Sequence, residues 1–201
     1  MAQVGCPALR PRARITVVAL ISYPQRLADH VARAPDRPAL TVDTPEGRRT
    51  WTRVEIESLA TRTARALAAR GVGPDDLVTI ALGNTADFVA TTVACWKLGA
   101  VPQPVSARLP RRELDAIIEL AEPRVVVATP IDVAGFDDAP LPDAVSNPYK
   151  AMTSGGSTGR PKLILANQPS LIDPEATPLL GMQIDGTNFS RVVVIRATLQ
   201  H

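Results

Sequence analysis

Several residue types that carry specific chemistry are scarce in this 201-residue chain. It has only two cysteines and two histidines. Cys6 and Cys95 lie far apart in sequence and show neither the spacing of a redox pair nor that of a metal site. The sequence therefore predicts reduced thiols, no disulfide framework and no metal bound by the protein itself.

Aromatic residues and net charge are also low, at 3% of the chain and a formal +2. Proteins that bind nucleic acid usually carry a strongly basic face and place aromatic side chains among the basic ones for base stacking. Neither pattern is present in the sequence. We therefore expect no nucleic-acid partner.

Long apolar runs are absent as well. The run "ITVVALIS" has eight residues, whereas a membrane-spanning helix needs about 20. Three arginines precede this run, as in a signal peptide, but no small-residue cleavage site follows it directly. We predict a cytoplasmic protein without a membrane span, in which residues 1–20 form a loose N-terminal tail.

From residue 21 onward, helical and extended patterns alternate along the chain. Apolar residues at helical intervals alternate with short β-branched runs. Such alternation predicts an α/β fold with a mainly parallel sheet flanked by helices on both faces. The expected helices cover residues 24–35, 52–70, 84–98 and 110–122, and the expected strands cover residues 38–43, 76–82, 100–105 and 124–129.

Residues that begin and end helices stand at the expected boundaries. Thr52 and Glu55 have the spacing of a capping box, and Asn84 can cap the third helix. Gly71 and Gly99 stand where glycine commonly ends a helix. These signals support the predicted helix limits.

Other residues have plain structural interpretations. The proline- and aspartate-rich residues 129–148 predict a surface connection. We expect Trp51, Phe88, Trp96 and Cys95 in the core, and Arg108, Arg111, Arg112 and Glu113 at a solvated helix entrance.

The segment "MTSGGSTGRPK", Met152 to Lys162, favours phosphate binding. Its glycines let successive N–H groups point at an anion, its hydroxyls add donors, and Lys162 adds positive charge. The same composition is also typical of a flexible loop, and composition alone leaves both interpretations open. The candidate nucleotide-binding residues are Ser154, Gly155, Gly156, Ser157, Thr158, Gly159 and Lys162.

This loop is neither of the two common nucleotide-binding motifs. A Walker loop has lysine after glycine and before Ser or Thr, followed by a helix. Here Lys162 follows "GRP" and precedes the β-prone residues "LIL". The strand-loop-helix dinucleotide fingerprint is absent too.

The loop resembles the signature of the AMP-binding, adenylate-forming enzymes, which include acyl-CoA synthetases, luciferases and nonribosomal adenylation domains. Residues 154–162 match every signature position, and the one mild departure precedes them at Ala151. The resemblance extends over about residues 21–185 through "APDRPAL", "RTWTRVEIESLATRTARALAARGVGPDDLVTIAL" and "FVATTVACWKLGAVPQPVSARLPRRELDAIIELAEPRVVVA". Within the family, "TSGGSTGRPKLIL" with "DPEATPLLGM" is most similar to the fatty-acyl and bile-acid CoA ligase branch.

The resemblance implies a reaction, its cofactors and its partners. Family members activate a carboxylic acid with ATP and Mg²⁺ and pass the acyl group to a thiol, commonly that of CoA. The loop would hold the β and γ phosphates of ATP. A fatty or sterol acid would be the substrate of a complete enzyme.

The resemblance also implies that family elements are absent after the loop. An adenine-binding segment, a hinge and a C-terminal domain with the catalytic lysine are not found, so residues 21–201 resemble an incomplete N-terminal part of the large domain. We expect no catalytic residue in this chain and no turnover by the chain alone. The ending "SRVVVIRATLQH" departs from the family, and we hypothesise a frameshift there.

Other interpretations remain open at this stage. The chain can be a noncatalytic nucleotide-binding or interaction module that pairs with an intact homologue or with a separately encoded C-terminal half. It can also be a phosphate binder unrelated to the family. An incomplete sheet would leave an exposed edge that favours self-association.

Overall fold

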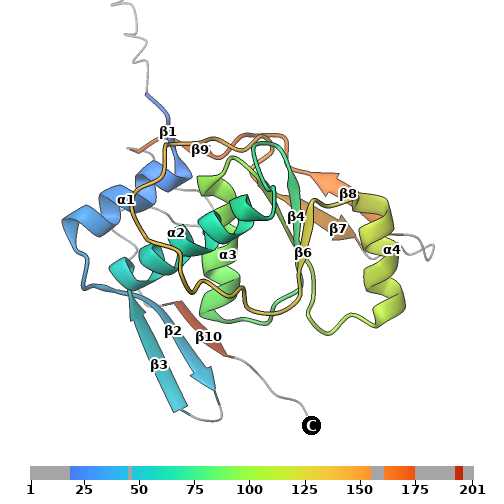
Figure 1. The fold of residues 1–201 in the computed structure, drawn as a ribbon, viewed down its shortest axis with the longest axis horizontal. Helices are drawn as coiled ribbons and strands as arrows, with labels where there is room; N and C mark the ends of the chain where they lie inside the picture. The colour runs from blue at the N-terminus through green and yellow to red at the C-terminus, as the bar shows by residue number, and fades with distance from the viewer. Residues whose placement is uncertain (1–18, 45–46, 155–160, 175–192, 197–201) are drawn as a thin grey trace, which may run out of the picture.

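A three-stranded parallel sheet lies at the centre of the molecule. The computed structural model describes residues 19–44, 47–154, 161–174 and 193–196 (Figure 1). The central strands are β4 (Leu77–Ile80), β5 (Val101–Pro104) and β6 (Val125–Val127), in the order β5-β4-β6. The predicted α/β fold with a parallel sheet is confirmed.

The helices that connect these strands cover opposite faces of the sheet. Helix α3 (Ala86–Lys97) links β4 to β5, and α4 (Arg111–Ala121) links β5 to β6 across β4. The chain moves across the sheet from β4 to β5 and then back past β4 to β6. Since such connections are right-handed, this change of direction places α3 and α4 on different faces, as Figure 1 shows. Helices α1 (Tyr23–Arg33) and α2 (Arg53–Ala69) pack with α3.

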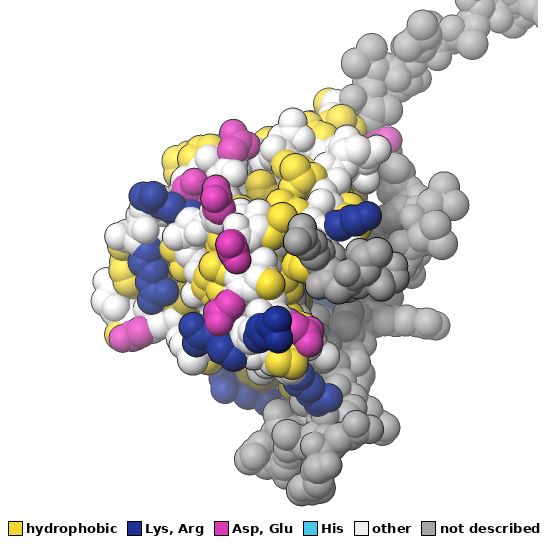
Figure 2. Space-filling view, turned by 90° about the vertical axis from the view of Figure 1, so that its right-hand side faces the viewer, with side chains coloured by type: hydrophobic (Ala, Val, Ile, Leu, Met, Phe, Trp, Pro, Cys, Tyr) yellow, Lys and Arg dark blue, Asp and Glu magenta, His cyan; other side chains and the backbone are white. Residues whose placement is uncertain are grey.

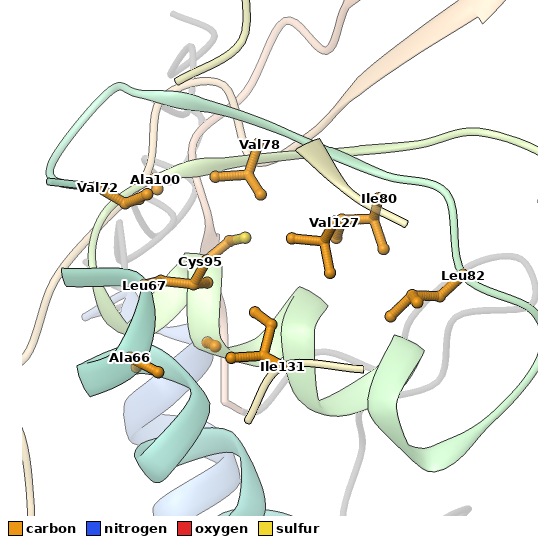
Figure 3. Close-up of a cluster of buried hydrophobic side chains, with 12 residues drawn as sticks. Ala66, Leu67, Val72, Val78, Ile80, Leu82, Cys95, Ala100, Val127 and Ile131 are labelled. Atoms are coloured by element: carbon orange, nitrogen blue, oxygen red, sulfur yellow. The ribbon is translucent and has the colours of Figure 1, made fainter. Parts of the chain in front are cut away.

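The largest hydrophobic core lies on the α2 and α3 face of the sheet. Figure 3 shows Val78, Ile80 and Val127 from the sheet facing Leu67 of α2 and Cys95 of α3. Burial raises the pKa of the Cys95 thiol, so the thiol stays protonated and serves as a small apolar side chain. The prediction that Cys95 is buried is confirmed.

Two helices end as their sequences predict. At the start of α2, the Thr52 amide donates to Glu55 Oε2 at 2.7 Å and the Glu55 amide donates to Thr52 Oγ1 at 3.3 Å, so the predicted capping box is confirmed. Gly71 and Gly99 follow α2 and α3 with φ of +82° and +69°. Both glycines belong to the paired backbone hydrogen bonds of a Schellman motif, which favours a residue without Cβ.

Two expectations need correction. Thr85, rather than Asn84, caps α3: the cap lies one residue later than predicted, and the Phe88 amide donates to Thr85 Oγ1 at 3.4 Å. Residues 129–148 contain no helix or strand, as predicted, but they are not only a surface connection. Ile131 is buried and Phe136 packs on the main core, so this segment closes part of it.

Peripheral strands complete the described fold. Strand β2 (Pro38–Thr44) pairs antiparallel with β3 (Gly47–Thr52) and parallel with β10 (Val193–Arg196). Strand β1 (Ile21–Ser22) pairs antiparallel with β9 (Leu171–Ile172). The sequence prediction missed β3 because its mostly exposed residues lack apolar alternation.

No helix in the described part of the chain is long and apolar enough to cross a membrane. The predicted tail, residues 1–20, lies outside the described residues except for its last two positions.

Candidate functional site

The two ends of the signature segment lie on neighbouring antiparallel strands, which together are called the hairpin below. Strand β7 (Ala151–Ser154) pairs antiparallel with β8 (Lys162–Leu165), and Ser154 is the direct partner of Lys162. The structure therefore brings together the first and last of the predicted site residues. The others, Gly155, Gly156, Ser157, Thr158 and Gly159, lie outside the described residues.

Aromatic side chains hold the base of this hairpin to α1 and α3. Trp96 donates its indole N–H to the Tyr149 carbonyl oxygen at 2.8 Å. The Tyr23 ring lies 5.0 Å from the Trp96 ring and 5.9 Å from the Tyr149 ring, both edge to face. Edge-to-face contacts at these distances are favourable, and the prediction of Trp96 as a core residue is confirmed.

A buried glutamine joins the other end of β7 to the central sheet. Thr79 of β4 donates its hydroxyl to Gln103 Oε1 at 2.7 Å, and Gln103 Nε2 donates to Thr153 Oγ1 at 3.1 Å. Thr153 directly precedes Ser154. Sequence reasoning missed Gln103, whose only signal was one amide side chain within the apolar run "AVPQPV". Thr153 belongs to the segment Met152 to Lys162 but was not among the candidate site residues.

A pocket of about 760 Å³ lies beside the hairpin, between the end of β5 and α4. The hairpin lines it with Thr153, Ser154 and Pro161, and α4 contributes Arg112 and Glu113. The expectation that these two α4 residues are exposed at the helix entrance is confirmed. Their place beside the signature segment is new, because sequence order does not show which loop α4 approaches.

Charges of both signs surround this region. Figure 2, turned by 90° from Figure 1, shows Lys and Arg side chains interspersed with Asp and Glu on the visible face, without one large patch of a single sign. Lys162 is exposed at the end of the hairpin. The positive charge beside the signature therefore comes from individual side chains rather than from a broad basic face.

A transition-metal site has no candidate ligands in the described residues. No group of three or more His, Cys, Asp or Glu side chains among them is placed to hold a metal ion. Beside Ser154 and Lys162 the structure places hydroxyls, the Arg112 guanidinium and the Glu113 carboxylate. The hydroxyls and the two cations, Lys162 and Arg112, suit an anionic ligand.

Comparison with known proteins decides the family. Residues 27–148 match the family model described as "AMP-binding enzyme". The chain belongs to this family. The matched residues run from α1 to the end of the segment before the hairpin, so the match includes the central sheet and is independent of the signature loop.

Curated AMP-binding relatives are mainly nonribosomal peptide synthetases. CymA of Salinispora arenicola, a probable non-canonical synthetase of this kind, is 28% identical over 183 residues, which cover 81% of this chain and 2% of CymA. Enterobactin synthase component F of Escherichia coli is 26% identical, covering 73% of this chain and 12% of that protein. The chain therefore spans a small part of these relatives.

Solved structures share the fold. The N-terminal subdomain of NpsA from Klebsiella oxytoca superposes with a TM-score of 0.61 and 23% identity, covering 73% of this chain and 42% of that one. The N-terminal domain of FACL13 from Mycobacterium tuberculosis superposes with a TM-score of 0.63 and 21% sequence identity. This match covers 72% of this chain and 44% of that one. The described fold matches part of the N-terminal subdomain of adenylate-forming enzymes.

Proposed function

We propose that this chain supplies the ATP-phosphate-binding hairpin of an adenylate-forming enzyme. In that reaction a carboxylate oxygen attacks the α-phosphorus of ATP, the bond from this phosphorus to its bridging oxygen breaks, and pyrophosphate leaves. The acyl group of the adenylate is then transferred to a thiol. The observation that carries the proposal is the pairing of Ser154 with Lys162, which brings the first and last residues of the signature side by side.

The described side chains suit the charge that develops in this step. Negative charge grows on the departing pyrophosphate, and fixed donors that meet it lower the barrier. Ser154 offers a hydroxyl at the pocket, and Lys162 an ammonium on a flexible stem. In the proposal, Gly155, Gly156, Ser157, Thr158 and Gly159 add donors between these two.

The acid and the acceptor thiol form the finer part of the proposal. The signature and the residues after it resemble fatty-acyl and bile-acid CoA ligases, so we propose a fatty or sterol acid with CoA as acceptor. FACL13 and a fatty acyl-adenylate ligase from L. pneumophila among the solved structures support an acyl substrate. The nonribosomal peptide synthetases among the relatives favour instead an amino or aryl acid and a protein-bound thiol.

Binding of MgATP to the chain tests the phosphate role. Replacing Lys162 by Met removes a charge-assisted contact, so we expect the Kd for MgATP to rise about tenfold, or 1.4 kcal/mol. Lys150→Met is the matched control, because Lys150 lies at the base of the hairpin with its Nζ 5.2 Å from the Tyr149 ring centre. Equal effects of the two changes would contradict the proposal.

Exchange of labelled pyrophosphate into ATP tests the reaction. We would compare fatty, sterol, amino and aryl acids, and then offer CoA as acceptor to any acid that supports exchange. The sequence-based expectation is no exchange by this chain alone, which any signal above background would overturn. A folded chain that does not bind MgATP would instead favour the interaction module as its function.

A further inference from the structure

Gln103 has an unusual position for an amide side chain. It is fully buried, as is Thr79, its direct partner in the register of β4 and β5. Side chains alternate between the faces of a strand, so both lie on the face opposite the core side chains Val78 and Ile80. A buried amide is costly unless it is hydrogen-bonded, and Gln103 is bonded on both sides.

The distances give this hydrogen-bond chain a direction. A separation of 2.7 Å between Thr79 Oγ1 and Gln103 Oε1 is typical of a hydroxyl donating to a carbonyl oxygen. The 3.1 Å from Gln103 Nε2 to Thr153 Oγ1 is typical of an N–H donor. Donors and acceptors are thus matched from β4 to β7, and bonds in such a chain strengthen one another.

The hydrogen bonds from Thr79 through Gln103 to Thr153 link two sheets that share no backbone strand pairing. Among the described strands, β7 and β8 form their own two-stranded sheet, and β4, β5 and β6 form another. Near the signature end of β7, the relation between the sheets depends on side chains. Thr153 is the last residue before Ser154, so its position sets where the chain enters the loop.

We propose that Gln103 is a positioning residue for Ser154, the first residue of the phosphate-binding signature, acting through Thr153. The inference rests on the proposed function and adds two residues outside the signature to it. With Thr153 held by Gln103, the hairpin is ordered before the ligand arrives, so binding need not include the entropic cost of ordering it. Gln103 itself does not touch ATP in this proposal.

Variants at both ends of the Gln103–Thr153 bond test the role. We expect Thr153→Val and Gln103→Met each to raise the Kd for MgATP about fivefold, while Thr153→Ser keeps the hydroxyl and stays within about twofold of wild type. The Kd of the double variant for MgATP should be no higher than that of the weaker-binding single variant, because both changes break the same hydrogen bond.

Thr41→Val is the matched control for a loss of stability. Thr41 is buried, whereas Thr153 is half-buried, and it shares a 2.9 Å hydrogen bond with Thr50 that joins β2 to β3. Its melting temperature should fall like that of Thr153→Val while its Kd for MgATP stays unchanged. Circular dichroism establishes that each variant folds before its affinity is compared, and Thr153→Ser supplies a conservative second variant.

The outcomes separate the two proposals. If Lys162→Met weakens MgATP binding but Thr153→Val does not, only the positioning role fails. Equal weakening by Thr41→Val and Thr153→Val would also overturn it, because the effect would then follow stability alone. If the wild-type chain does not bind MgATP, the proposed function fails and the positioning role fails with it.

Discussion

The packed body of the molecule and the β7–β8 hairpin are stabilised in different ways. In the body, side chains such as Leu67 and Ile80 are fully buried between helices and sheet. On the hairpin, the directly paired Met152 and Ile164 share one face and are 42% and 46% exposed. Burial therefore stabilises the body, whereas an aromatic contact at one end and a polar link at the other hold the hairpin.

This difference matters for binding. A segment with few buried apolar contacts opens at a lower free-energy cost than the core does. The signature begins and ends on this less buried hairpin, whereas most of the buried apolar side chains that stabilise the fold lie in the packed body. Changes in the body should therefore act mainly on the free energy of unfolding, and changes at the hairpin mainly on ligand binding.

Leu67→Ala should give the largest loss of stability. Leu67 is fully buried against β4 and α3, and truncating such a side chain leaves a cavity and costs about 2–5 kcal/mol. Urea unfolding followed by circular dichroism measures the change. A loss below about 1 kcal/mol would contradict the view that this cluster is the main core.

Gly99→Ala should give the second-largest loss in the free energy of unfolding. Gly99 has a φ of +69°, and an added Cβ would lie 3.4 Å from the Val145 carbonyl oxygen. We expect a loss of about 1–2 kcal/mol. Gly135→Ala is the control, because Gly135 has a φ of +81° but nothing within 4 Å of the added atom. Thermal unfolding should show the smaller change for Gly135→Ala; the reverse order would contradict the close packing at Gly99.

Glu55→Gln should change the pH dependence of stability slightly. Hydrogen bonds from the backbone and hydroxyl of Thr52 lower the pKa of Glu55 below its ordinary 4.5. A carboxylate with a lowered folded-state pKa contributes stability that is present above about pH 4.5 and is lost as the pH falls. In urea unfolding, the free energy of unfolding of Glu55→Gln should fall less steeply between pH 5 and pH 3 than that of the wild type. Thr52→Ser should keep the wild-type pH dependence.

Polar substitutions on the outer face of the hairpin should have the smallest effect. Met152→Thr and Ile164→Thr replace exposed side chains, so each should change the free energy of unfolding by no more than about 0.5 kcal/mol. A stability loss as large as that of Leu67→Ala would show that this face is covered in solution.

Local signals account for what could be predicted from the sequence. Thr52 with Glu55, Gly71 and Gly99 act within a few residues, so they marked helix ends correctly. The α3 cap was wrong by one position, because Asn84 and Thr85 are both suitable caps and only the helix start decides between them. Strand β3 was missed because pairing with β2, rather than its own pattern, makes it a strand.

The sequence by itself determined the α/β class, the alternation of elements and the signature from Ser154 to Lys162, because these depend on residue type and short spacing. The tertiary structure alone decided that Gln103 meets Thr153, fifty positions later, and that Arg112 lines the same pocket as Ser154. Contacts of this kind depend on the order of strands in the sheet and the face on which each helix packs. Short-range patterns carry no information on either.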